Sequence, residues 1–115
     1  MIVDQLRVWS THLAHKTCIQ TSNDRITYVE LYDRIRKMAT LLEPYINQPV
    51  LLLFHPQDII SFTVAFYACL MVGAITVPVG ENYSRIQDDC NAQAIITSWS
   101  IYLKLRWTTW ATSFI

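Results

Sequence analysis

The chain has 115 residues, of which 52% are hydrophobic and 16% charged, and its formal net charge is zero. The length is sufficient for one domain with its own core, and the composition excludes a disordered chain and a basic surface for a nucleic-acid backbone. Three cysteines, Cys18, Cys69 and Cys90, lack metal-binding or redox spacing, so we expect reduced thiols and a cytoplasmic location.

The first sixteen residues predict a short amphipathic helix that caps the core. Its apolar positions follow helical spacing and are Ile2, Leu6, Trp9 and Leu13. Asp4 and Arg7 lie where the apolar core of a signal peptide would have to be, so we do not expect secretion. His12 and His15 could reach one metal ion from a helix, but no third ligand of suitable spacing follows them, and we expect no metal site.

A β-hairpin is expected next. Residues 17–21 and 25–27 flank Ser22, Asn23 and Asp24, whose side chains favour turns because they bond the local backbone. The hairpin is thus predicted to lie on the N-terminal side of the main core.

A second helix is predicted to begin where the hairpin ends. Thr27 and Glu30 have the spacing of a capping box, in which each satisfies a backbone donor of the other. Pairs of opposite charge four residues apart, Glu30 with Arg34 and Asp33 with Lys37, indicate the solvent-facing side. The buried side is expected to consist of Leu31, Ile35, Met38, Ala39 and Leu42.

The stretch from Val50 to Val79 is the expected centre of the molecule, and its first part predicts a buried strand. Val50 to Phe54 is a continuous apolar run, which is typical of a strand covered on both faces in a parallel sheet. His55 and Pro56 end this run.

A helix and a second strand are predicted to follow. Asp58 can cap a helix from Ile59 to Val72 that is apolar on nearly every side, and Gly73 is placed to end it in the left-handed conformation. Ala74 to Val79 is then extended, and a crossover of this length returns a strand parallel to its predecessor. The prediction is an α/β fold with a mainly parallel sheet.

The residues after Val79 predict one more helix and one more strand. Ser84 and Gln87 repeat the capping-box spacing at the start of a short helix through Asn91, and Ala94 to Thr97 predicts a strand.

Three segments together resemble one enzyme family. The early core segment of the adenylate-forming ligases consists of an apolar strand, a Pro-containing turn and then the pattern FVxAFxxCLxAGxxxVPV. This chain has a similar segment, LLLFHPQDIISFTVAFYACLMVGAITVPV. Within the family, the Cys before Leu is most like the fatty acyl-AMP ligases. ITYVELYDRIRKMATLL resembles the family segment lTYxELxxxaxxxAxxL, and RIQDDCNAQAIITS resembles rlxxilxdaxaxxvltt. The resemblance runs from about Ile2 to Ser98.

The resemblance implies a partial N-terminal domain at residues 1–98, with an incomplete, mainly parallel sheet, flanking helices and an N-terminal hairpin. Residues 99–115 are then a divergent tail, which truncation or a frameshift would explain. The start of the stretch from Ser98 to Ile115 could be the family's next helix, but Trp107 to Ile115 matches no family pattern.

The implied parent activity is ATP-dependent activation of a fatty acid to its acyl adenylate, with Mg, and with fatty acid and an acyl carrier protein as partners. The family's phosphate loop, nucleotide-binding acidic segments and late catalytic Lys have no counterpart here, and the two glycines, Gly73 and Gly80, are not in a phosphate-binding run. We therefore assign no catalytic, cofactor-binding or metal residue, expect no cofactor on this chain, and leave open whether it is an enzyme. We expect it to self-associate.

Local candidates for chemistry have simpler structural explanations. His55 follows the carboxyl end of a strand, where open α/β sheets bind ligands, but it can equally be a turn residue. Ser61 and Thr63 lie in an apolar helix, where hydroxyls commonly bond the preceding turn. Asp88 and Asp89 are adjacent and point to different sides of a helix, as solvated charges do.

Two alternatives compete with the ligase interpretation. The uncharged run from Ile59 to Gly80 has the length of a membrane span, although Gly73 and Pro78 interrupt it. The second alternative is a small interaction module that uses an aromatic and basic mixture near the end of the chain. That mixture consists of Trp99, Lys104, Arg106, Trp107 and Trp110.

Overall fold

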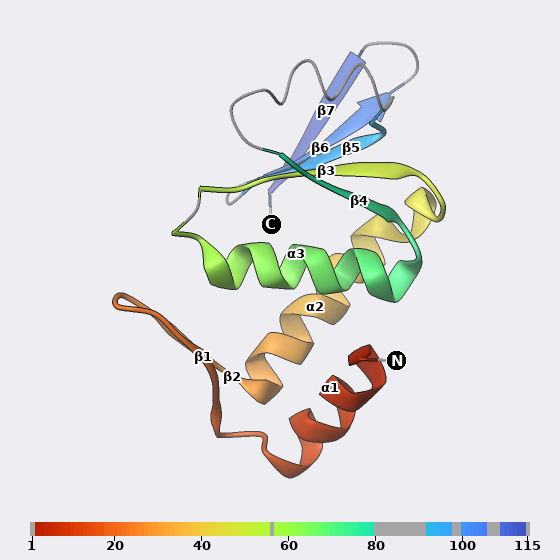
Figure 1. The fold of residues 1–115 in the computed structure, drawn as a ribbon. Coiled ribbons are helices and arrows are strands. Elements are labelled where there is room, and N and C mark those ends of the chain that lie inside the picture. Colours follow the sequence, from red (N-terminus) through yellow and green to blue (C-terminus); the bar gives the residue numbers. More distant parts are fainter. Residues whose placement is uncertain (1, 56, 80–91, 98–99, 106–108, 115) are drawn as a thin grey trace.

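The computed structural model describes residues 2–55, 57–79, 92–97, 100–105 and 109–114, with side chains described from residue 4 to residue 97 within those ranges. Figure 1 shows a sheet at the top, two helices beneath it, and a further helix with a hairpin below. The helices and strands in chain order are α1 (Ile2–His12), β1 (Thr17–Gln20), β2 (Arg25–Thr27), α2 (Tyr28–Leu42), η1 (Glu43–Tyr45), β3 (Pro49–Leu53), α3 (Ile59–Val72), β4 (Ile75–Val79), β5 (Ala94–Ile96), β6 (Ser100–Leu105) and β7 (Thr109–Phe114).

The main sheet has the strand order β4-β3-β5-β6-β7. Strand β3 pairs in parallel with both β4 and β5, as predicted, and the α/β fold class is confirmed. Strands β6 and β7 are antiparallel and extend the sheet on one side. The prediction that the start of the tail could be a helix is therefore wrong, because Ser100–Leu105 pairs with the edge of β5 that the parallel strands leave open. The predicted helix from Ser84 to Asn91 lies outside the described residues.

The N-terminal hairpin and the start of α2 agree with the sequence. Strands β1 and β2 pair antiparallel with Gln20 opposite Arg25. At the helix start the Thr27 hydroxyl accepts from the Glu30 N–H at 3.3 Å, and the Glu30 carboxylate accepts from the Thr27 N–H at 3.2 Å. Hydrogen bonds from Thr27 lower the pKa of Glu30. The predicted capping box is confirmed.

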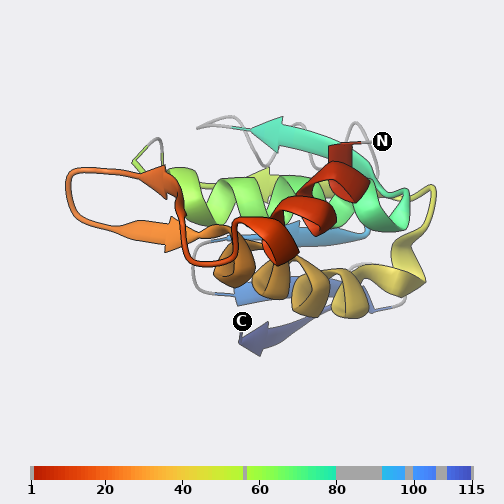
Figure 2. The same cartoon turned by 90° about the horizontal axis from the view of Figure 1, so that it is seen from below.

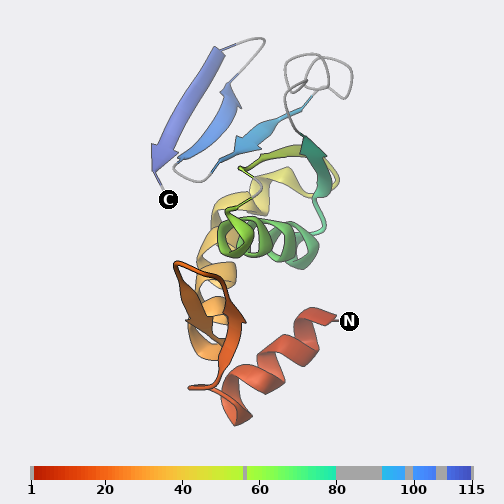
Figure 3. The same ribbon diagram turned by 60° about the vertical axis from the view of Figure 1, so that its left-hand side comes forward.

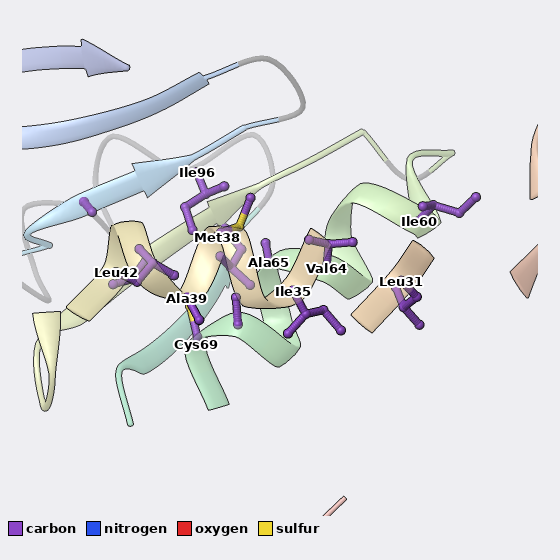
Figure 4. Close-up of a cluster of buried hydrophobic side chains, with 14 of the residues drawn as sticks. Leu31, Ile35, Met38, Ala39, Leu42, Ile60, Val64, Ala65, Cys69 and Ile96 are labelled. Carbon is purple, nitrogen blue, oxygen red and sulfur yellow. The ribbon is translucent and has the colours of Figure 1, made fainter. Parts of the chain in front are cut away.

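The main core lies between α2, α3 and one face of the sheet. All five residues predicted for the buried side of α2 are buried, and the α3 residues that oppose them are small or branched. Figure 4 shows the side chains of both helices pointing toward each other beneath Ile96 of β5. The α3 contribution consists of Ile60, Val64, Ala65, Ala68 and Cys69.

Strand β3 is buried on both faces, as its continuous apolar run predicted. Val50 and Leu52 belong to the main core on the helical side. Leu51, which alternates with them, belongs to a second apolar cluster with Ala92 and Ile95. β3 is thus the central parallel strand to which both cores attach.

The edge strand β4 contains a proline at a position where the sheet tolerates it. The Ile75 N–H donates to the Gln48 carbonyl at 2.9 Å, so Ile75 directs its hydrogen bonds toward β3. Successive residues direct their backbone groups to opposite edges, so Thr76 and Pro78 face away from β3. Pro78 has no N–H, and it therefore removes one donor from the open edge.

Helix α1 packs on α2 and α3 at the side of the helical layer away from the sheet, as Figures 2 and 3 show. Leu6 is buried, as predicted, but Trp9 remains 38% exposed and its ring meets Tyr28 edge to face at a centroid distance of 5.9 Å. The buried position one turn after Leu6 is Ser10, whose hydroxyl donates to the Arg7 carbonyl at 2.6 Å. Because this local bond satisfies the hydroxyl donor, Ser10 can be buried without leaving that donor unpaired.

Helix α3 begins and ends where the sequence predicted. Asp58 is at its N-cap, although its side chain makes no capping hydrogen bond. Gly73 has φ 78°, and its N–H donates to the Cys69 carbonyl at 3.0 Å. Of the helices that the structure describes, none combines the length and hydrophobicity needed to cross a bilayer.

Candidate functional site

A polar groove lies between the tip of the β1–β2 hairpin and the start of α3, the helix that follows β3. Its volume is about 840 Å³, and it separates the hairpin tip from the first turn of α3. The lining residues are Gln20, Thr21, Ser22, Asn23, Asp24, Arg34, Gln57, Asp58, Ile59, Ile60 and Ser61. The sequence did not predict this groove, because its two walls are more than thirty residues apart.

His55, the sequence candidate that follows β3, has a structural role in the turn. Its Nδ1 accepts from the Gln57 N–H at 3.2 Å, and its carbonyl accepts from the Asp58 N–H at 2.8 Å. These bonds shape the connection that leads from β3 into α3. His55 is exposed and is not among the residues that line the groove.

The hairpin wall of the groove is fixed by its own hydrogen bonds. The Thr21 hydroxyl accepts from the Asp24 N–H at 3.0 Å and donates to the Asp24 carbonyl at 3.2 Å. Asp24 Oδ1 accepts from the Arg25 N–H at 2.8 Å. These hydroxyl and carboxylate groups of the wall therefore form hydrogen bonds within the turn itself.

The chemistry of the groove suits polar contact more than catalysis. Its ionic groups are Asp24, Arg34 and Asp58, a mixture of both signs. Within the described ranges no three His, Cys, Asp or Glu residues are placed to hold a metal ion together. These residues do not form the cluster of cations and carboxylates that a magnesium nucleotide requires, so we derive no catalytic step from them.

Some of the remaining candidates from the sequence have a structural role that the structure shows, and the others lie outside the described residues. The Thr63 hydroxyl donates to the Ile59 carbonyl at 2.7 Å, the predicted bond to the preceding turn, while Ser61 lines the groove. Lys104 and Trp110 face each other in the register of β6 and β7, with their side chains outside the described part. The candidates whose structure is not described are Asp88, Asp89, Cys90, Trp99, Arg106 and Trp107.

A second cavity, which we call the apolar cavity, lies where α1, β1, α2 and α3 meet, and it has a volume of about 210 Å³. It too was not predicted, because each element contributes only two residues. They are Leu6, Trp9, Cys18, Ile19, Tyr28, Leu31, Thr63 and Tyr67.

The two described cysteines are free thiols with different surroundings. Burial raises the pKa of Cys69 to about 12, as expected for a small apolar core residue. Burial also raises the pKa of Cys18, and this is partly opposed by a side-chain hydrogen bond with Tyr28. A raised pKa leaves little thiolate near neutral pH, so neither thiol is activated as a nucleophile.

Comparison with known proteins gives a consistent family. The model of the AMP-binding enzymes matches residues 6–112. The fatty acid AMP ligase from Legionella pneumophila has the same fold, with a TM-score of 0.72 and 23% identity over 84% of this chain and 19% of that one. A benzoate CoA ligase from Burkholderia xenovorans LB400 gives a TM-score of 0.68 and 26% identity over 83% and 21%.

The N-terminal subdomain of NpsA from Klebsiella oxytoca is also similar, with a TM-score of 0.68 and 18% identity over 84% of this chain and 27% of that one. The chain thus spans about a fifth of the length of the ligases with which it shares its fold. A comparison with curated protein sequences found no match.

Proposed function

Because the chain belongs to the AMP-binding enzyme family, we propose that it is the N-terminal segment of a fatty acyl-AMP ligase-like enzyme. The parent activity is ATP-dependent activation of a fatty acid to acyl adenylate, and this segment does not catalyse it alone. The observation that carries the proposal is the family match over residues 6–112. The choice of fatty acid follows the sequence pattern around Cys69, since the fold is shared alike with the Legionella pneumophila fatty acid AMP ligase and with the benzoate CoA ligase.

The segment contributes scaffold to this activity. Formation of an adenylate requires clustered donors and cations around the α-phosphorus. The chain has two glycines, Gly73 and Gly80. Of these, Gly73 serves as the end of α3. The described polar groove carries one arginine, Arg34, against two aspartates, which is too little positive charge for a triphosphate.

The rest of the proposal concerns the parent enzyme. ATP and Mg would bind parts of it that this chain does not match, the acyl group would pass from the fatty acid toward an acyl carrier protein, and the reaction would occur in the cytoplasm. We place the partial N-terminal domain at residues 1–98. The family model extends past this boundary to residue 112, so at the carboxyl end only the last three residues of the chain lie beyond its match.

The proposal is tested in two arms. The purified chain, given ATP, Mg and a long-chain fatty acid, is expected to release no pyrophosphate above a heat-killed control. In the second arm, residues 6–97 replace the equivalent segment of the Legionella pneumophila ligase. The chimera is expected to retain fatty-acid-dependent pyrophosphate release.

A matched control chimera carries Leu52→Asp, which places a charge in the buried strand β3 and should abolish folding and activity. Pyrophosphate release by the isolated chain would contradict the claim that it is inactive alone. A chimera that folds with a cooperative transition but has lost its activity would contradict the claim that this segment is the ligase scaffold.

A further inference from the structure

The apolar cavity has the size of a small-ligand site. A cavity of about 150 Å³ lined by aliphatic and aromatic side chains stays dry and binds benzene in another protein. The cavity here measures about 210 Å³, so one six-membered ring with a short substituent fits within it. Its lining includes Trp9, which is 38% exposed, so the cavity is not sealed from solvent and a ligand can enter it.

The walls of the cavity favour an aromatic ligand. Trp9 and Tyr28 meet edge to face at 5.9 Å with an interplanar angle of 68°, and Tyr67 contributes a further ring from α3. A bound ring can meet these rings in the offset or edge-to-face arrangements that aromatic pairs prefer. Leu6 and Leu31, which are buried, close the aliphatic side.

Three polar side chains of the lining have partners within the chain. The Thr63 hydroxyl donates to the Ile59 carbonyl at 2.7 Å, and Tyr28 shares a side-chain hydrogen bond with the Cys18 thiol. None of the lining residues carries a charge at neutral pH. A charged ligand would lose its hydration without gaining a counter-ion, whereas an uncharged one would not.

We propose that the apolar cavity between α1, β1, α2 and α3 binds an uncharged molecule with a single aromatic ring. The site is separate from the polar groove and does not depend on the proposed ligase function. Cys18, which lines the cavity and is half-buried, provides a reporter of its occupancy.

The experiment measures alkylation of Cys18 in the full chain by N-ethylmaleimide, by mass spectrometry of the Cys18 peptide, with toluene or benzoate present. The two probes share a ring and differ in charge. Toluene near its solubility limit is expected to slow alkylation of Cys18 by roughly threefold or more, which corresponds to a site about two-thirds filled or better. Benzoate at the same concentration is expected to have little effect.

Two variants locate the bound molecule. Thr63→Leu adds volume to the cavity wall and should abolish the protection of Cys18. Thr63→Val keeps the volume and should retain the protection, because the lost hydroxyl bonds only its own helix. Far-UV circular dichroism confirms that both variants fold, and the wild-type chain gives the primary result without either.

Several results would overturn the proposal. They are unchanged alkylation in toluene, equal protection by benzoate, and protection that persists in folded Thr63→Leu. Equal slowing at Cys69, which is buried in the main core away from this cavity, would show a general effect of the solvent and would also overturn it.

Discussion

Helices α2 and α3 pack against each other beneath the same sheet, yet they meet their surroundings in different ways. α2 buries one apolar side and turns the other to solvent, where Lys37 and Asp33 pair at 2.9 Å. α3 buries an equal number of residues but carries no charge on its remaining surface. Half-buried Phe62, Phe66 and Met71 lie there instead.

The difference concerns how far each helix has its apolar surface covered by this chain. A helix with one polar side normally packs with its apolar side on a core and its polar side in water, whereas a helix that is apolar all round is normally covered on every side. Along α3, Phe62 stacks with Phe66 at 6.0 Å, and these rings continue to Phe54 at one end and Tyr67 at the other. This aromatic row is the surface we expect further chain of the parent enzyme to cover.

The largest expected effect on stability is at the contact between α2 and α3. Ile35→Ala removes a side chain with 0% exposure at the contact of α2 with α3, and it should lower the free energy of unfolding by about 2–5 kcal/mol. Denaturant titration measures this change. The matched control is Thr40→Ala on the exposed side of α2, which should change stability by less than about 0.5 kcal/mol. Equal effects of the two substitutions would contradict the assignment of the buried side.

A smaller effect is expected at the start of α2. Thr27→Ala removes the hydroxyl that accepts from the Glu30 N–H, and it should cost about 1 kcal/mol. Thr27→Ser retains the hydroxyl and should lose little stability. Thermal unfolding at fixed pH compares the two variants. If alanine and serine gave the same midpoint, the capping box would contribute nothing measurable.

The smallest effect on stability is expected at the edge of β4. Pro78→Val restores an outward N–H, so it should change the unfolding free energy little and increase association through the strand edge. The Val79→Thr substitution, on a residue whose backbone faces β3, is the control and should leave edge pairing unchanged. Sedimentation velocity measures the association. An unchanged distribution for Pro78→Val would show that this edge is protected by something besides the proline.

Local patterns in the sequence predicted much of this fold. The capping box at Thr27 and the left-handed Gly73 depend on neighbours within a few residues, and both were read correctly. The run SIYLKL alternates apolar and polar positions, which is the period of a strand, and the expectation of a helix there followed from the family resemblance instead. Its pairing with β5 depends on contacts between strands, which no local pattern specifies. Helical spacing predicts Trp9 on the buried face of α1, but its ring remains exposed and packs on Tyr28, nineteen residues later in the chain.

The candidate sites were less predictable than the fold. His55 was singled out because it follows a strand, and its turn role depends on the N–H groups of Gln57 and Asp58. The polar groove and the apolar cavity are assembled from elements that the chain brings together only on folding, and no local motif marks either one.

The central claim is that the aromatic row on α3 is the surface of a segment that the parent enzyme completes. Sedimentation velocity of the isolated chain over a range of concentrations tests it most directly, with the Phe62→Ser/Phe66→Ser variant beside it. The wild-type chain is expected to form oligomers or aggregates, and the variant, whose substitutions lie on the half-buried surface, should shift toward monomer while retaining its helix content. A monodisperse wild-type monomer with a sharp cooperative thermal transition would show that the chain completes its own core, and would contradict the account.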